Sequence, residues 1–101
     1  LGWYGDTPLE LACRRGRAAV VSLLLARGVD PSERGDEGRP NSLMKAASGR
    51  SVWRSDHVAV LRVLLEDGRV PVDARDWEGR TALWWACSEG NADRARVLLM
   101  A

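Results

Sequence analysis

The chain has 101 residues, of which 46% are hydrophobic and 29% charged, a balance typical of a globular protein rather than a disordered one. Fifteen Lys and Arg side chains offset fourteen Asp and Glu side chains, and a net charge of +1 argues against nucleic acid or an anionic membrane surface as the main partner. The apolar runs, such as residues 20–26, are too short to span a bilayer, and no signal peptide is expected. Because the chain begins at Leu1 rather than Met and ends on the apolar run 97–101, we expect it to be a piece of a longer protein.

The first predicted helix begins in the stretch TPLE. Thr7 and Glu10 have the spacing of a capping box, and Pro8 takes the first helical position, where its missing N–H is not needed. A second helix is predicted in the stretch VVSLLLARG, in which apolar residues recur at helical intervals. Gly28 ends that stretch where a left-handed C-cap belongs. The pattern therefore predicts a pair of short helices.

The same pattern recurs twice more. The corresponding leucines Leu9 and Leu43 are 34 residues apart, whereas Leu43 and Leu83 are 40 residues apart. The six additional residues belong to the middle unit, where the stretch SGRSVWRS (48–55) separates the two helices. A repeat of this length predicts stacked helix pairs, each of which completes its core against its neighbours.

The later units carry their own start and stop signals. Asn41 and Thr81 are predicted N-caps of the first helices of units two and three, and Asp56 is the predicted N-cap of the second helix of unit two. Gly68 is the matching C-cap, and DWEG (76–79) suits the tip of a hairpin-like finger between units.

The stretches TPLELA, NSLMKA and TALWWA resemble the T-P-L-H-x-A motif of the ankyrin repeat family, and VVSLLLARG and DWEG resemble its second-helix and finger motifs. The resemblance implies an all-α fold, an ankyrin-repeat solenoid of stacked helix–turn–helix units with short hairpin-like fingers. We expect one domain over residues 1–101 with three units, 1–33, 34–73 and a truncated 74–101. The resemblance also implies an intracellular protein–protein interaction scaffold, cytoplasmic or nuclear, and not an enzyme. The family's motif histidine is replaced here by Glu10, Met44 and Trp84.

The sequence contains few residues of the types that act as nucleophiles, metal ligands or acid–base catalysts. Cys13 and Cys87 occupy equivalent positions in units one and three, where we expect small, buried, reduced thiols too far apart for a disulfide. His57, the only histidine, falls at the start of a second helix and favours a structural or capping role. No nucleophile motif, metal-ligand spacing or phosphate loop is present, so no catalytic residue, metal or cofactor is predicted.

The first candidate for partner binding is the finger tip of unit three. Trp77, Glu78 and Arg80 flank its glycine, and the matching residues of unit two include Asp36 and Glu37. Aromatic and guanidinium groups are enriched at the energetic centres of interfaces. The alternative is that Trp77 folds back on its neighbouring finger.

The second candidate is the groove side of the first helices. On a helical wheel Trp85 lies nearly opposite the buried arc and its equivalent in unit two is Lys45, whereas Trp84 lies on the flank that faces an adjacent repeat. Trp85 is therefore the preferred anchor, with simple packing on the finger base as the alternative. Further candidates near the ends of these helices are Arg14, Arg15, Ser88 and Glu89.

The third candidate is the insertion, where Trp53 lies between basic residues and either contacts a ligand or tucks onto the helix ends. The leading hypothesis is recognition of a protein partner. The alternatives are nucleic-acid or acidic-ligand contact through an Arg-rich edge, and self-association through the apolar end 97–101. The Arg-rich edge consists of Arg14, Arg15, Arg17, Arg50 and Arg54.

Overall fold

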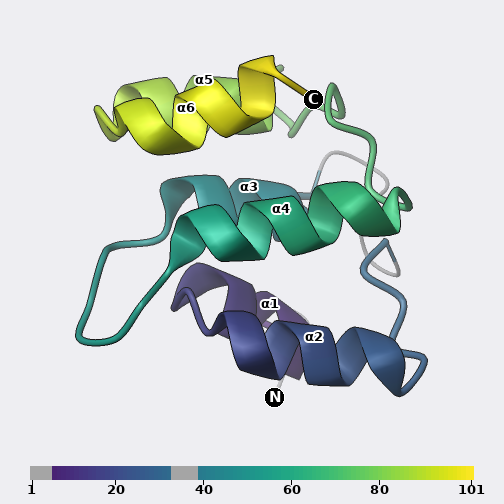
Figure 1. The fold of residues 1–101 in the computed structure, drawn as a ribbon. Coiled ribbons are helices and arrows are strands. Elements are labelled where there is room, and N and C mark those ends of the chain that lie inside the picture. The colour runs from purple at the N-terminus through teal and green to yellow at the C-terminus, as the bar shows by residue number, and fades with distance from the viewer. Residues whose placement is uncertain (1–5, 33–38) are drawn as a thin grey trace.

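The computed structural model describes residues 6–32 and 39–101. These residues form three helical hairpins, stacked in chain order with no strand among them (Figure 1). The first helices of the hairpins make an inner layer and the second helices an outer layer, and each layer packs unit against unit. The helices are α1 (Pro8–Arg14), α2 (Ala18–Ala26), α3 (Ser42–Ser48), α4 (His57–Asp67), α5 (Ala82–Ser88) and α6 (Ala92–Leu99).

The predicted caps fix where the inner helices begin. Thr7 accepts a hydrogen bond from the backbone N–H of Glu10 at 3.1 Å, and Glu10 Oε1 accepts the backbone N–H of Thr7 at 2.9 Å, which completes the capping box. Asn41 and Thr81 cap α3 and α5 through the amides of the third helical residues. Each cap satisfies an N–H group that the helix itself leaves unpaired, a contribution of about 1 kcal/mol.

The outer helix α4 has the start and stop that its sequence predicts. The carboxylate of Asp56 accepts the backbone N–H of Ala59 at 3.0 Å. At the other end Gly68 adopts a left-handed conformation with φ of 79°, which a residue with a Cβ atom rarely takes. Gly28 is also left-handed but lies one residue beyond the C-cap of α2, Arg27, so the predicted left-handed conformation is confirmed at both glycines.

The core is densest in the middle unit, because this unit has a neighbour on each side. Leu43, Met44, Leu61 and Leu64 are all fully buried there. Ala46 and its neighbour Ala47 are also inaccessible, since they lie where α3 approaches the adjacent inner helices. The stack therefore shares one apolar core across all three units rather than holding three separate ones.

The two cysteines do not share an environment, and the expectation that both are buried is wrong for Cys87. Cys13 is fully buried, and so is Ala47 at the equivalent position of unit two, whereas Cys87 is exposed. In units one and two the next unit covers this position, and α5 has no further unit on that side. Burial, with a smaller effect from the Glu10 carboxylate, raises the pKa of the Cys13 thiol to about 12. Both thiols are free, as predicted.

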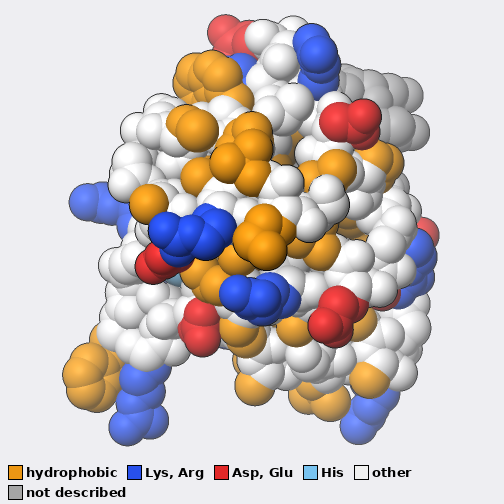
Figure 2. Space-filling view, turned by 45° about the horizontal axis from the view of Figure 1, so that its top comes forward, with side chains coloured by type: hydrophobic (Ala, Val, Ile, Leu, Met, Phe, Trp, Pro, Cys, Tyr) orange, Lys and Arg blue, Asp and Glu red, His pale blue; other side chains and the backbone are white. Residues whose placement is uncertain are grey.

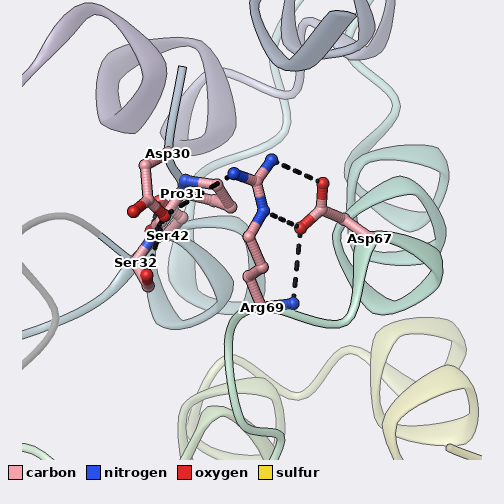
Figure 3. Close-up of polar contacts among 6 residues, drawn as sticks. All are labelled: Asp30, Pro31, Ser32, Ser42, Asp67 and Arg69. Carbon is pink, nitrogen blue, oxygen red and sulfur yellow. Dashed lines mark hydrogen bonds and ion pairs between the residues drawn. The ribbon is translucent and has the colours of Figure 1, made fainter. Parts of the chain in front are cut away.

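Polar contacts join the loops that follow the outer helices (Figure 3). The guanidinium of Arg69 binds both carboxylate oxygens of Asp67, at 2.8 and 2.9 Å, and approaches Asp30 of the preceding loop at 3.9 Å. Close by, the Ser42 hydroxyl donates to the backbone carbonyl of Pro31 at 3.2 Å. These contacts fix the register of unit two on unit one at the finger side of the stack.

Candidate protein-interaction site

A buried carboxylate organises the finger of unit three, residues 76–80. The Asp76 side chain is only 1% exposed. Its oxygens accept the backbone N–H groups of Glu78 and Arg80 at 3.0 and 2.9 Å. They also accept the Arg80 Nε–H at 2.9 Å and the Trp85 indole N–H at 3.3 Å. With the Asp76 amide bonded to the Arg80 carbonyl at 2.9 Å, the finger is a closed turn held from its base.

The surroundings of Asp76 also set its protonation. Burial raises its pKa, but hydrogen bonds from the Arg80 amide and guanidinium and from the Glu78 amide outweigh burial and hold the pKa below its usual value of 3.8. The finger is therefore organised by a carboxylate that stays ionised at neutral pH.

Trp77 lies at the tip of this turn and is 70% exposed. Gly79 supplies the left-handed residue, with φ of 78°, and donates its amide to the Asp76 carbonyl at 2.9 Å. Beside it, Glu78 Oε1 pairs with the Arg80 guanidinium at 2.6 Å. With so much of its surface in solvent, Trp77 projects from the turn. The unit-two equivalents Asp36 and Glu37 lie outside the described residues.

Arg80 connects the finger to the two tryptophans of α5. Its guanidinium carbon lies 4.4 Å from the ring centroid of Trp85 and 5.1 Å from that of Trp84. The two indoles meet edge to face with centroids 5.1 Å apart. Trp85 is half-buried and hydrogen-bonded to Asp76, so its indole packs on the base of the finger. Packing there was the alternative to a role as partner anchor. Trp84 is 46% exposed, on the side of α5 where no further unit packs.

Lys45 and Arg14 meet on a single carboxylate. Lys45 Nζ lies 2.9 Å from Asp6 Oδ1, and Arg14 Nε lies 2.8 Å from Asp6 Oδ2. Burial raises the pKa of Asp6, and its hydrogen bonds and ion pairs with these two cations bring the pKa below 3.8. Leu11, Lys45 and Trp85 are equivalent positions on α1, α3 and α5, and we refer to them as the finger-side row.

A buried guanidinium organises the insertion, and sequence reasoning missed it. Arg94 of α6 is only 3% exposed. It donates to the carbonyls of Ala46, Ala47 and Gly49 at 3.2, 3.0 and 2.5 Å, and to the Ser51 hydroxyl at 3.2 Å. Burial lowers its pKa. It thus caps the C-terminal end of α3, where carbonyl groups have no partner within the helix.

Trp53 projects from this insertion and is 79% exposed, so it does not tuck onto the helix ends. Its backbone carbonyl accepts Arg17 Nη1–H at 2.8 Å, and its ring faces the guanidinium of Arg54 at 5.4 Å. Figure 2 shows apolar and basic side chains projecting from the body at the lower left, the side of the insertion in Figure 1. The loop therefore displays its indole while its backbone is tied to units one and three.

His57 has the structural role that its position predicts. Its ring is buried, and Nε2 lies 2.7 Å from the Arg14 carbonyl, so Nε2 must carry the hydrogen of this bond. Burial lowers the pKa of His57. Gly49 allows the close approach, since a Cβ atom there would lie 2.0 Å from the Arg14 oxygen. His57 thus joins the end of α1 to the start of α4.

The candidate residues other than Lys45, which lies midway along α3, fall into two groups at opposite ends of the inner helices. At the finger end the structure brings together Trp77, Glu78, Arg80 and Trp85. The opposite end holds Trp53, Arg14, Arg15, Ser88 and Glu89. Partner contact by any of these residues stays a prediction.

Stacked pairs of antiparallel helices with turns projecting from one side define a helical-repeat solenoid. The family model for ankyrin repeats in three copies matches residues 32–101, and the model for a single ankyrin repeat matches residues 4–36. The chain belongs to the ankyrin repeat family, whose repeats are generally protein–protein interaction modules rather than enzymes.

Solved and curated relatives agree with this assignment. The crystal structure of the human ASB11 ankyrin repeat domain superposes with a TM-score of 0.80 and 34% identity, over 94% of this chain and 39% of that one. The chain is 32% identical to human transient receptor potential cation channel subfamily A member 1 over 95% of its own length and 8% of the channel's. It is also 32% identical to the palmitoyltransferase AKR1 of Lachancea kluyveri, over 97% of this chain and 13% of that protein. The chain thus spans a small part of each curated relative.

None of the helices in residues 6–32 and 39–101 has the length and apolar character needed to cross a membrane. In the same residues, no three or more His, Cys, Asp or Glu side chains are grouped so that they could hold a metal ion.

Proposed function

We propose that this chain is a protein-recognition module whose partner contacts the finger of unit three and the finger-side row. One observation carries the proposal: Trp77 exposes 70% of its surface on a turn that the buried Asp76 holds closed. A side chain displayed on a fixed turn loses less conformational freedom on binding than one on a mobile loop. Tryptophan is also the residue type most enriched where interfaces gain most of their energy.

The neighbours of Trp77 have distinct roles in this proposal. Glu78 and Arg80 form the polar rim, and Arg80 also covers the rings of α5. Trp85 keeps its indole N–H on Asp76 and offers the partner the remainder of its half-buried ring. Lys45, held by Asp6, extends the surface along the inner helices.

The proposal is tested by selecting binders from a phage-displayed random peptide library on the wild-type chain. The selected peptides are then titrated against Trp77→Ala and, as a matched loss of an exposed indole at the other end, Trp53→Ala. We expect Trp77→Ala to weaken binding by about 2 kcal/mol, roughly 30-fold, and Trp53→Ala to leave it within about twofold. Peptides that bind Trp77→Ala as tightly as the wild type would contradict the placement of the site.

The outer face of unit three supports a second candidate function, self-association. Trp84 and Cys87 are exposed there, although the equivalent positions of units one and two are buried. Leu99 is also exposed, whereas its equivalents Leu25 and Leu65 are partly buried. Figure 2 shows apolar side chains exposed over the part of the surface where α5 and α6 lie. Light scattering at two concentrations tests it: the apparent mass rises with concentration for the wild type and stays at the monomer value for Trp84→Glu. A monomer mass at both concentrations for the wild type excludes it.

The free thiols of Cys13 and Cys87 bear on where in the cell the chain is found. Free cysteines, one of them exposed, fit the reducing interior of a cell. We therefore propose an intracellular location.

A further inference from the structure

A hollow lined by arginines lies between the end of α1 and the insertion. Its volume is about 460 Å³, within the range of about 300–1,000 Å³ that ligand pockets occupy. Four of its lining residues are arginines and none is acidic. The lining residues are Arg14, Arg15, Arg17, Ser48, Gly49, Arg50 and Val52.

Two of the four guanidinium groups have no partner among the described residues. Arg14 is paired with Asp6, and Arg17 donates to the Trp53 carbonyl. The side chains of Arg15 and Arg50 are exposed and make no hydrogen bond or ion pair with any residue in the part of the chain that the structure describes. A guanidinium presents its N–H groups in a planar fork that matches a carboxylate.

Arg15 and Arg50 are not needed to pair with the free carbonyl groups at the C-terminal ends of α1 and α3. A helix C-terminus attracts cations because its last carbonyl groups lack partners. Here, however, His57 already binds the Arg14 carbonyl, and Arg94 already binds the carbonyls of α3 and Gly49. The positive charges of Arg15 and Arg50 therefore remain available to a ligand.

Besides Asp6, which pairs with Arg14, an acidic side chain near the hollow is Glu89, in an adjoining hollow that shares Gly49 and Arg50 with this one. Glu89 is exposed and forms no ion pair with Arg50. The two hollows together thus contain more cationic than anionic groups, and the buried Arg94, which lines the adjoining hollow, is one of the cations.

We propose that this hollow binds an acidic peptide segment of a protein partner, with its carboxylates on Arg15 and Arg50. Val52 lines the hollow, and both Val52 and the adjacent Trp53 are exposed, so they offer apolar contact to the residues next to the carboxylates. The hollow is separate from the finger of unit three, and the inference rests on the proposed function only for the kind of partner.

A peptide fits the observations better than nucleic acid does. Proteins that depend on the phosphate backbone typically neutralise about 6–10 phosphates. The hollow offers two free guanidinium groups, and the chain as a whole has a net charge of +1. Two free forks suit a pair of neighbouring carboxylates.

The test is fluorescence anisotropy with a labelled hexaglutamate peptide, a hexaglutamine peptide and a single-stranded 12-nucleotide DNA. The variants are the double substitution Arg15→Gln/Arg50→Gln and a charge-matched control, Arg27→Gln/Arg75→Gln, whose arginines are exposed and lie outside the hollow. We expect the wild type to bind hexaglutamate and not hexaglutamine, and the first double variant to bind it about five- to tenfold more weakly. The control variant should stay within about twofold of the wild type.

Three results would overturn the proposal. They are no hexaglutamate binding by the wild type up to millimolar peptide, an equal loss in both double variants, and tighter binding of the DNA than of hexaglutamate. Thermal melts establish that both double variants are folded. The Trp77→Ala substitution is at the finger end, so this variant should bind hexaglutamate like the wild type. Failure of the arginine-lined hollow as a binding site is therefore distinguishable from failure of the finger site.

Discussion

The finger of unit three and the insertion of unit two are built alike, except that the buried side chain that holds each loop has the opposite charge. Each displays one tryptophan mostly in solvent, and each is fixed by one buried charged side chain that makes four hydrogen bonds. In the finger the buried group is the carboxylate of Asp76, which accepts. In the insertion it is the guanidinium of Arg94, which donates.

The difference follows from which backbone groups each loop turns inward. The finger is a tight turn before α5, and its inward-facing groups are the N–H donors of Glu78 and Arg80, which require an acceptor. The insertion leaves the end of α3, where the inward-facing groups are carbonyls, which require a donor. The sign of each buried charge thus matches the backbone groups that its loop presents to it.

The largest expected effect comes from removing the buried cation. Arg94→Met leaves the carbonyls of Ala46, Ala47 and Gly49 buried without a donor, so we expect a loss of about 3 kcal/mol in the free energy of unfolding. Urea denaturation measures it. Arg96→Met is the matched control on the same helix, because Arg96 is exposed and, among the described residues, pairs only with Asp93. Its effect should be below about 0.5 kcal/mol. Equal urea midpoints for the two variants would refute the role of Arg94.

Replacing the buried anion should cost less. Asp76→Asn keeps one acceptor oxygen but loses the charge, so we expect about 1–2 kcal/mol of destabilisation, together with faster hydrogen exchange at the Glu78 and Arg80 amides. Asp73→Asn, at an exposed residue before the finger, serves as the control. The contrary finding is protection of the two amides that does not change in Asp76→Asn.

Lowering the pH should reduce the stabilisation that Asp76 provides and leave the stabilisation that Arg94 provides unchanged. The folded-state pKa of Asp76 is below 3.8, so its stabilisation is fully present above that pH and is lost as the pH falls through the folded-state pKa. The gap in unfolding free energy between wild type and Asp76→Asn should therefore narrow from pH 6 to below pH 3. The gap between wild type and Arg94→Met should not change in that range, since a guanidinium does not titrate there. Parallel pH profiles for the two gaps would count against this account.

The smallest effects are expected at the displayed indoles themselves. Trp53→Ala and Trp77→Ala each remove a side chain that is mostly in solvent, so each should shift the unfolding free energy by less than about 0.5 kcal/mol. Urea midpoints for the two variants check this. A loss above 1 kcal/mol for either would show that its indole packs on the body rather than serving display.

Local signals made much of this fold predictable. The caps at Thr7, Asn41, Asp56 and Thr81 join residues three positions apart, so a single short stretch contains both partners. The unit length and the position of the insertion follow from the spacing of equivalent leucines. The DWEG turn was predictable for the same reason, because a turn motif contains its own geometry.

What the sequence did not reveal depends on contacts between units. Arg94 binds carbonyls 45 to 48 residues away along the chain, and His57 binds a carbonyl 43 residues away. The signal for Arg94 was present, since it occupies the position of Val20 and Val60 in the other units. Cys87 was misassigned because its burial is decided by a neighbouring unit and not by its own helix.

The most direct test of the central claim, that the finger of unit three displays Trp77 to a protein partner, uses the indole N–H groups as reporters. The chain has five tryptophans, so a ¹⁵N correlation spectrum offers one indole signal for each, assigned by single Trp→Phe variants. A peptide selected on the wild-type chain is then added stepwise. We expect the Trp77 indole signal to move most, with a smaller change at Trp85, while the Trp53 signal stays in place. A stationary Trp77 signal at saturating peptide would contradict that claim.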